Sequence, residues 1–186
     1  GILHSFPTRR SSDLLLAGHE TTTNMTGNAV RALLSHRGEW EKICRDPSLI
    51  PGAIEECLRF ASSVVCWRRR ALVDVVIGGV SIPAGSNILL ATGSANHDEA
   101  RFPNGETFDI TRANAREHIA FGNGIHFCLG AALARLELRV ILEELVRRWP
   151  GMRLIDEPID MVRTLAFRGP VRLMVALDAT GLRVPG

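Results

Sequence analysis

The residue with the clearest chemical potential is Cys128, which ends the glycine-rich stretch Phe121–Gly130 directly before a helical pattern. Gly122, Gly124 and Gly130 can adopt backbone conformations that other residues avoid, so the loop can lie flat against a planar group. The free N–H groups and the positive dipole end of the following helix favour a thiolate over a thiol. An exposed thiolate on such a loop is a good ligand for a metal in a planar macrocycle. A lone cysteine is more often a small buried hydrophobic residue, and the loop by itself leaves both interpretations open.

The spacing Phe121-x-x-Gly124-x-His126-x-Cys128-x-Gly130 resembles the haem-binding signature of the cytochrome P-450 family. The resemblance implies that Cys128 is the axial thiolate ligand of the iron in haem b, iron protoporphyrin IX. It also implies that Phe121 packs under the thiolate and that Gly130 lets the helix approach the porphyrin. The porphyrin is further expected to contact Gly122 and Ala134, and its propionates to contact Arg69, His118 and His126.

A second chemical pattern lies in the helix that apolar residues predict over Leu14–Leu34. Its stretch AGHETTTN contains a glycine, which weakens a helix, and three threonines whose hydroxyl groups compete for backbone carbonyls. A solvated polar stripe without a role is the simpler interpretation. The order AGxETT, however, resembles the oxygen-activation motif of the same family. By that match Ala17 and Gly18 leave room for dioxygen. Thr21 would hold the distal hydrogen-bond network, and Glu20 would help to deliver protons.

The helix predicted over Pro51–Ala61 carries Glu56 and Arg59 three residues apart, and therefore on one face. An exposed pair of this kind contributes little to stability, and that is the default interpretation. The spacing resembles the family's ExxR motif, and the segment DITR resembles the one that supplies a second arginine. The resemblance implies that Glu56, Arg59 and Arg112 form a buried network with a structural role.

The stretch Ser62–Arg70 is expected to run as an extended strand past the haem, and it resembles the family's substrate-contacting segment. Val64, Val65 and Trp67 would then face a small and apolar organic substrate. The family more often has prolines at the start of this stretch. In a strand, Arg69 faces away from its two arginine neighbours, so a shift of one residue would change which arginine meets a propionate.

Three weaker patterns complete the chain. A β-hairpin is predicted over Val73–Leu90, with its turn at the glycine pair GG. Ala95–Phe102 resembles a short family helix, in which His97 is expected to be structural rather than catalytic. The segment Met152–Leu177 alternates enough between apolar and polar residues to predict short strands.

The long helix that follows Cys128 is expected to end at Pro150. Its exposed arginines are most simply a solvated face; the sharper alternative is a basic patch that meets an acidic iron–sulfur partner. The resemblance implies ferredoxin and ferredoxin reductase as partners, with electrons ultimately from NAD(P)H. The residues expected inside are Leu133, Leu136, Leu138, Ile141, Leu142 and Leu145, and those expected outside are Arg135, Arg139, Glu143, Arg147 and Arg148.

Composition narrows the class of protein. The chain has 186 residues, 46% of them apolar, and can bury one sizeable core. A formal net charge of +2 gives no indication of a nucleic-acid partner. The four cysteines lack CxxC or zinc-like spacing, so the sequence predicts neither a disulfide framework nor a structural zinc site, and a reducing, cytoplasmic setting fits. No apolar run approaches the ~20 residues that a membrane span needs.

The first residues do not match the rest of the chain. The stretch His4–Leu14 resembles the conceptual translation of a common sequencing adaptor, so we expect residues 1–14 to be a non-native tail and the native sequence to begin near Leu15. Amplification across the junction from source DNA tests this expectation, because a continuous product that encodes these residues would exclude it.

Taken together, these motifs predict residues 15–186 to be the C-terminal, haem-binding half of a bacterial cytochrome P-450, truncated at its N-terminus. The expected fold is mainly α with small β-sheets (α+β). The expected function is a monooxygenase that inserts one oxygen atom from dioxygen into an organic substrate, although this half alone is expected to be inactive. An inert fragment and a haem-binding sensor or carrier are the alternatives.

Overall fold

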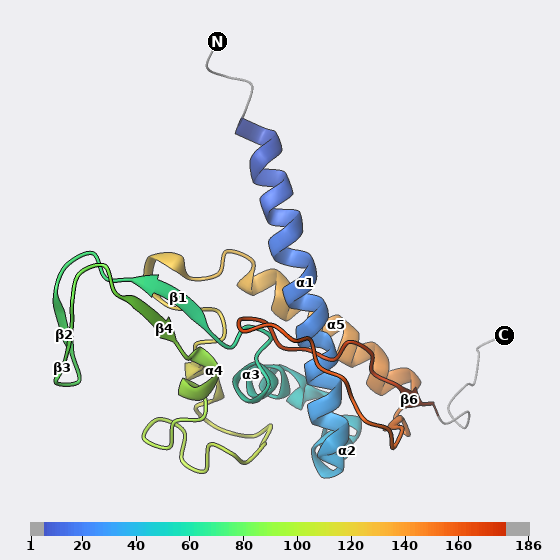
Figure 1. Ribbon diagram of the computed structural model, residues 1–186. Coiled ribbons are helices and arrows are strands. Elements are labelled where there is room, and N and C mark those ends of the chain that lie inside the picture. The colour runs from blue at the N-terminus through green and yellow to red at the C-terminus, as the bar shows by residue number, and fades with distance from the viewer. Residues whose placement is uncertain (1–5, 178–186) are drawn as a thin grey trace.

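The computed structural model describes residues 6–177 and is mainly helical with three small two-stranded sheets, which confirms the expected fold class (Figure 1). Among these residues, no helix combines the length and the apolar character needed to cross a membrane. The α-helices are α1 (Phe6–Ser35), α2 (Arg37–Arg45), α3 (Ile50–Phe60), α4 (Thr92–Ala95) and α5 (Ala131–Arg148). Single 3₁₀ turns are η1 (Pro47–Leu49), η2 (Ala115–Glu117) and η3 (Gly124–His126). The strands are β1 (Trp67–Arg70), β2 (Val75–Ile77), β3 (Val80–Ile82), β4 (Asn87–Leu90), β5 (Arg153–Leu154) and β6 (Val175–Ala176).

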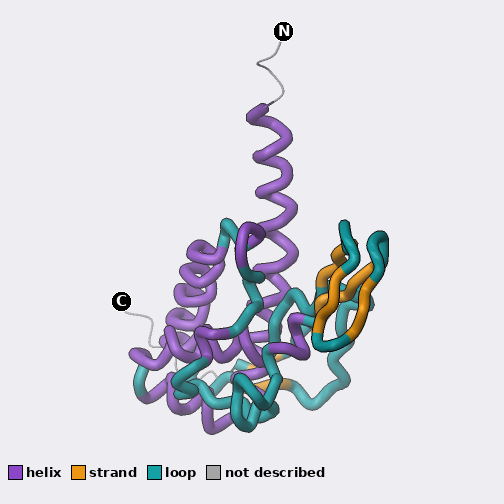
Figure 2. The backbone as a smooth tube through the Cα atoms, turned by 90° about the vertical axis from the view of Figure 1, so that its left-hand side faces the viewer, coloured by secondary structure: helices purple, strands orange, loops and turns teal. Residues whose placement is uncertain are grey.

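The longest helix, α1, starts earlier than the sequence predicts. It begins at Phe6 rather than Leu14, so the expected foreign tail continues the helix from residue 6, while residues 1–5 lie outside the described part. The N-terminal half of α1 stands clear of the other elements, as both views show (Figures 1 and 2). Its C-terminal half packs on α2, α3 and α5.

The core lies between the C-terminal half of α1 and the three helices that it contacts. Met25, Ala29 and Leu33 recur every fourth residue on α1 and are almost completely buried. Trp40 of α2 is fully buried, and its indole N–H donates to the Pro150 carbonyl at 2.8 Å. The buried face of α2 therefore fixes the end of α5, where the chain turns back at the predicted proline.

A turn near the C-terminus packs closely against α1. A Cβ added to Gly27 would lie 2.7 Å from the Pro170 ring, so only a glycine lets the turn approach this closely. The Asn28 amide donates to the Arg168 carbonyl at 2.8 Å. The turn and α1 are thus joined by both shape and hydrogen bonding, although they are about 140 residues apart in the chain.

The strands form antiparallel pairs beside the helices (Figure 2). β2 and β3 make the predicted hairpin, and its turn residues Gly78 and Gly79 have φ of 56° and 80°. Both values lie in the left-handed region that a type I′ turn requires and that glycine adopts without strain. β4 leaves the hairpin to pair with β1, with Trp67 opposite Leu90 and Arg70 opposite Asn87.

Two sequence-based boundaries are wrong. The strand expected over Ser62–Arg70 is regular only from Trp67, because the preceding residues make an isolated bridge to Phe167 instead of a ladder. The helix expected over Ala95–Phe102 lies earlier, at α4, and turns follow it. The Asp98 carboxylate accepts the Ala100 N–H at 2.9 Å, and such local side-chain bonds compete with helix formation.

The orientation of α5 also differs from the prediction. Leu138 and Leu142 are buried as expected, but Leu133 and Leu136 are 59% and 56% exposed. Arg135, expected outside, turns inward to a buried carboxylate at 2.7 Å. The helix is apolar on more than one face, and its neighbours α1, α2 and α3 in this chain cover only one of them.

Candidate functional site

Cys128 stands at the end of an exposed loop that is held by its own backbone hydrogen bonds. Its N–H donates to the Phe121 carbonyl at 2.9 Å, and its carbonyl accepts the Ala131 N–H at 3.3 Å. Gly122 and Gly124 have φ of 73° and 69°, which other residues rarely adopt. The cysteine is exposed and forms no disulfide. The loop therefore holds a free thiol at the start of α5.

The surroundings of Cys128 fit a planar, apolar ligand. Ile125, Phe127 and Leu129 are 97%, 54% and 86% exposed, an unusual concentration of large apolar side chains beside a free thiol. A haem ligated by the cysteine would cover such side chains. A Cβ added to Gly130 would lie 3.9 Å from the thiol sulfur, so packing within the chain does not explain this glycine. Its expected role in close approach to a porphyrin remains a prediction.

Within residues 6–177, no group of three His, Cys, Asp or Glu side chains is placed to hold a metal ion. Within these residues the site at Cys128 offers one protein ligand, the cysteine sulfur. A single thiolate on an open loop fits a metal whose remaining in-plane ligands come from its own macrocycle.

Phe121 joins the Cys128 loop to a buried ion cluster. The guanidinium of Arg135 lies over the Phe121 ring, 4.6 Å from its centroid. The same guanidinium donates to both oxygens of the Glu55 carboxylate, at 2.7 and 3.0 Å. A planar two-point contact of this kind fixes the arginine more firmly than a single bond does. Glu55 therefore determines where Arg135 lies, and Arg135 packs against the ring next to the candidate metal ligand.

The sequence analysis did not identify Glu55, whose side chain is only 4% exposed. Burial by itself would raise the pKa of this carboxyl, but hydrogen bonds from His118 and Arg135 outweigh it and lower the pKa to about 2. Arg116 adds a longer contact at 3.7 Å. One feature of the sequence could have indicated a role for Glu55: it is a second acidic residue next to Glu56 in an amphipathic helix.

The two histidines expected at the propionates lie in different environments. His126 is exposed within η3 on the Cys128 loop. His118 is buried: its Nε2 lies 3.1 Å from the Glu55 carboxylate and its Nδ1 accepts the Ala120 N–H at 3.1 Å. Both ring nitrogens of His118 are thus engaged within the chain, and its expected propionate contact stays a prediction.

The oxygen-activation motif lies on the projecting part of α1. Ala17, Gly18 and Glu20 are exposed, and the Thr21 hydroxyl donates to the Ala17 carbonyl at 2.7 Å. Thr23 and Thr26 make the same bond to the carbonyl four residues earlier, so the threonines are accommodated without a break in the helix. A Cβ added to Gly18 would meet nothing within 4 Å. No contact within the described chain explains why a glycine rather than a larger residue stands at this position.

The residues of the ExxR pattern lie together in the interior. Arg59 donates to both Glu56 oxygens at 2.8 Å, and both side chains are fully buried. Arg112 approaches the same carboxylate at 3.3 Å and is 9% exposed. The remaining guanidinium hydrogens are donated to backbone carbonyls of residues 96–107. One acid and two arginines thereby hold a long irregular segment against α3.

The substrate-contacting segment is only partly arranged as expected. Arg69 lies on exposed β1, where its guanidinium contacts the neighbouring carbonyl of Arg68 at 3.1 Å. Val65 packs against Gly93, where an added Cβ would come within 3.1 Å. Val65 also lines a cleft against α4. The expected substrate contacts of Val64 and Val65 stay predictions.

Three comparisons with known proteins show what this chain is similar to. The family model described as Cytochrome P450 matches residues 48–151, more than half of the chain. The 6-deoxyerythronolide B hydroxylase of Saccharopolyspora erythraea is 43% identical over 167 residues, which are 89% of this chain and 41% of the hydroxylase.

Solved structures are similar over almost the whole chain. The P450 heme domain of Tepidiphilus thermophilus has a TM-score of 0.89 at 48% identity, and the match covers 91% of this chain and 41% of that domain. Cytochrome P450 CREJ, solved in complex with (4-ethylphenyl) dihydrogen phosphate, has a TM-score of 0.87 at 52% identity, with 89% and 41% covered. This chain thus spans about two fifths of the length of the proteins that it matches.

Proposed function

The chain belongs to the cytochrome P450 family, and we propose that it is the C-terminal part of a haem-thiolate monooxygenase that inserts one atom of dioxygen into an organic substrate. The observation that carries the proposal is the free Cys128 thiol, exposed among three large apolar side chains on a loop fixed by glycines. The hydroxylase among its relatives supports an oxygenating role over that of a carrier or sensor.

Family membership implies a haem cofactor, which when bound supplies the activation of dioxygen. We propose haem b as that cofactor, with Cys128 as its axial ligand. Two backbone hydrogen bonds hold Cys128 in place: its N–H donates to the Phe121 carbonyl, and its carbonyl accepts the Ala131 N–H at the start of α5. Contacts of Gly122, Gly130 and Ala134 with the porphyrin belong to the same proposal.

Arg69 and His126 are the residues proposed to meet the haem propionates. Both are exposed, and neither forms a salt bridge to an acidic residue within the described chain. Arg69 lies on β1, and the pairing of β1 with β4 places its backbone opposite Ile88. A guanidinium with unused donors is well suited to a carboxylate.

Proton delivery is assigned to the motif on α1. The Thr21 hydroxyl donates its hydrogen bond to the Ala17 carbonyl, so the Thr21 oxygen is free to accept a hydrogen bond from an ordered water. That water could donate a proton to dioxygen bound in the space that Ala17 and Gly18 are proposed to leave open. Glu20, exposed on the same helix, would exchange the proton with solvent.

The substrate is proposed to be small and largely apolar. Val64, Val65 and Trp67 are the candidate contacts of this chain, and Trp67 is 45% exposed beside Phe167. The similar structure CREJ was solved with an aryl phosphate ester. A first substrate panel therefore contains 4-ethylphenol and its phosphate ester beside apolar compounds of similar size.

Electrons are proposed to come from NAD(P)H through a ferredoxin reductase and a ferredoxin in the cytoplasm. The exposed arginines Arg139, Arg147 and Arg148 on α5 form a basic surface for an acidic partner. Each is paired with a glutamate of the same helix, so the surface is only partly basic. Salt-dependent reduction rates would test the assignment.

The decisive experiment is the carbon monoxide difference spectrum of the reduced complete protein, with upstream sequence restored. The red-shifted thiolate band is expected in the wild type and in the control variant Cys44→Ser, whose sulfur lies on a different helix. It should disappear in Cys128→Ser. A red-shifted band that persists in Cys128→Ser would exclude this residue as the ligand.

Oxygenation itself is tested with labelled dioxygen and the substrate panel. The product should contain one labelled atom. In Thr21→Ala, more peroxide should be released per electron consumed, because the proposed proton relay is broken. Unchanged coupling in that variant would contradict the role of Thr21. The red-shifted band without any oxygenated product across a broad panel would favour a haem-binding carrier.

A further inference from the structure

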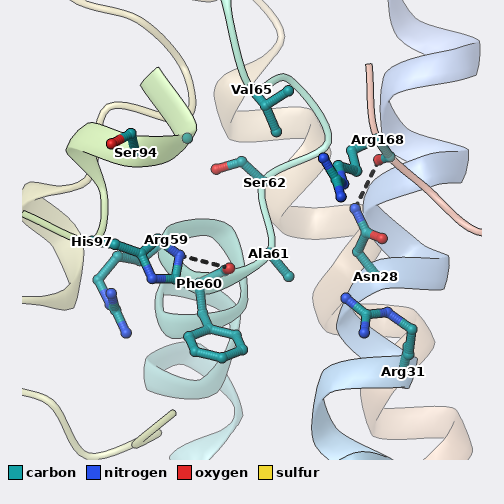
Figure 3. A pocket seen from close by; sticks show the side chains of 11 residues that line it. Asn28, Arg31, Arg59, Phe60, Ala61, Ser62, Val65, Ser94, His97 and Arg168 are labelled. Atoms are coloured by element: carbon teal, nitrogen blue, oxygen red, sulfur yellow. Dashed lines mark hydrogen bonds between the residues drawn. The ribbon is translucent and has the colours of Figure 1, made fainter. Parts of the chain in front are cut away.

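A cleft of ≈ 280 Å³ lies away from the Cys128 loop, between the C-terminal half of α1, the end of α3, α4 and the turn at Arg168 (Figure 3). Asn28 and Arg31 form one wall together with Arg168, and His97 and Ser94 lie on the opposite wall. None of the lining residues belongs to the Cys128 loop or to the oxygen-activation motif. The cleft therefore shares no residue with that loop or that motif, although Val65 of the expected substrate segment lines it.

The charge of this cleft is not balanced within the described residues. Three arginines and one histidine line it, and no aspartate or glutamate does. Arg59 is already neutralised by Glu56 and bonded to backbone carbonyls, so it contributes no free charge. Arg31 and Arg168 remain, and neither forms a salt bridge to an acid between residues 6 and 177.

Arg31 has the strongest unmet requirement. Its Nε is buried and has no hydrogen-bond partner within the part of the chain that the structure describes. Burial, and then the positive charge of Arg168, lower the pKa of Arg31. A buried guanidinium donor without an acceptor costs free energy, and a neighbouring cation adds repulsion. Both costs are relieved by an anion placed between the two guanidinium groups.

Arg168 is held in position for such a contact. Its N–H donates to the Ser63 carbonyl at 2.8 Å, and its carbonyl accepts the Asn28 amide at 2.8 Å. Asn28 is itself 99% buried, with a relative exposure of 1%. The backbone of Arg168 is therefore fixed from two sides, and only its side chain must be ordered when a ligand binds.

We propose that this cleft binds an oxyanion, phosphate or carboxylate, between the guanidinium groups of Arg31 and Arg168. Guanidinium groups match the planar pairs of oxygen atoms in these anions and form short charge-assisted hydrogen bonds with them. The oxyanion has two conceivable sources, a free anion from solution or a carboxylate side chain from the part of a complete protein outside this chain. The proposal does not depend on the oxygenase activity.

The test is a calorimetric titration of the complete protein with inorganic phosphate at low ionic strength. Arg31→Gln and Arg168→Gln should each weaken binding about 10- to 100-fold, the loss expected for one charge-assisted contact. Arg31→Lys keeps the charge but loses the planar pair of donors, and its affinity should fall between those of the wild type and Arg31→Gln. The matched control is Arg139→Gln, an exposed arginine on α5 that pairs with Glu143, and it should leave the affinity within about twofold.

The outcomes distinguish the two sources. Saturable binding that falls in both glutamine variants but not in the control supports the site with a free anion. Absence of saturable binding, together with a crystal structure of the complete protein that shows a carboxylate on both guanidinium groups, supports the site with an internal ligand. Binding unchanged in Arg31→Gln and Arg168→Gln, or neither binding nor a carboxylate, overturns the proposal. If one glutamine variant does not fold, the other decides.

Discussion

Charged groups on α3 are enclosed by partners, whereas large apolar groups on the Cys128 loop and α5 face solvent. We refer to the first as the closed side, which contains Glu55, Glu56, Arg59, Arg112 and Arg135. The second is the open side, which contains Ile125, Leu129, Leu133, Leu136 and Val140. The usual distribution, with charges outside and leucines inside, is thus reversed around this loop.

The difference shows which side chains find partners within the described part of the chain and which do not. Adjacent acids on the closed side each hold a different part of the chain: Glu56 holds the segment that ends at Arg112, and Glu55 holds His118 and Arg135. Every one of these carboxylates has partners within the described residues. The apolar side chains of the open side have no comparable cover among the described residues. A haem and the remaining part of a longer protein would cover this side. The four predictions below test this contrast.

The largest effect is expected from breaking the closed side at Glu56. Glu56→Ala leaves the guanidinium groups of Arg59 and Arg112 buried without their carboxylate, which should cost about 3–5 kcal/mol of unfolding free energy. Urea unfolding followed by circular dichroism measures the change. The control Glu143→Ala removes an exposed partner of Arg139 and should cost less than about 1 kcal/mol. Equal midpoints for both variants would contradict the closed side.

The two faces of α5 offer a matched pair of leucines. Leu138 is 1% exposed and Leu136 is 56% exposed, although they are two residues apart. Leu138→Ala should destabilise the chain by about 2–5 kcal/mol, because it leaves a cavity. Leu136→Ala should change the stability by no more than about 0.5 kcal/mol. If Leu136→Ala proves as costly in the same urea titration, the open side is already covered, for example by self-association.

Glu55 should make the stability of the closed side depend on pH. Its folded-state pKa, about 2, is below the ordinary value of 4.5, so its contribution is fully present above the ordinary pKa and is lost as the pH falls toward 2. The shift corresponds to about 3 kcal/mol. In Glu55→Gln, the stability at pH 7 should fall, and the loss of stability between pH 5 and pH 3 should be correspondingly smaller.

The control for this pH dependence is Glu144→Gln. Hydrogen bonds from Arg147 and Arg148 also lower the pKa of Glu144 to about 2, but its ion pairs are exposed and solvent screens them. Its removal should leave the dependence of the urea midpoint on pH unchanged. A pH profile of Glu55→Gln that matches the wild type would show that Glu55 does not hold the loop in the way the structure indicates.

The smallest effect is expected at Gly18, on the exposed part of α1. An added methyl group meets nothing, so Gly18→Ala should raise helix stability by up to about 1 kcal/mol. Gly169→Ala is the packed counterpart: its methyl group would overlap the Asn24 side chain and should cost about 1–3 kcal/mol. Thermal unfolding separates the two. In a complete enzyme, Gly18→Ala should lower oxygenation despite its stability, and full activity would argue that dioxygen does not need this space.

Much of the architecture was predictable because it is local. The amphipathic run of α3 and the paired glycines of the hairpin each determine a short stretch of backbone, and the structure has α3 and the β2–β3 turn where the sequence predicts them. The spacing of Glu56 and Arg59 likewise places both on one helix face. Family membership followed from the spacing of short motifs, since each depends on a few residues close together in the chain.

The sequence could not decide which of several equivalent groups would be used. α5 has leucines on more than one face and arginines among them, and only the positions of α1 and α3 determine that Leu138 is buried, Leu136 is exposed and Arg135 turns inward. Glu55 looked unremarkable because its partners His118 and Arg135 lie 63 and 80 residues away. The same holds for Arg31 and Arg168.

The sequence by itself therefore determined the family, the fold class and the candidate ligand Cys128, because those depend on residue types at short, fixed spacings. Only the tertiary structure decided which charges are compensated. It buried Glu55 with His118 and Arg135, and it brought Arg31 and Arg168 together without an acid. The physical reason is that a charge is stabilised or left unmet by what lies within a few ångströms of it in space, and no local pattern specifies that neighbour.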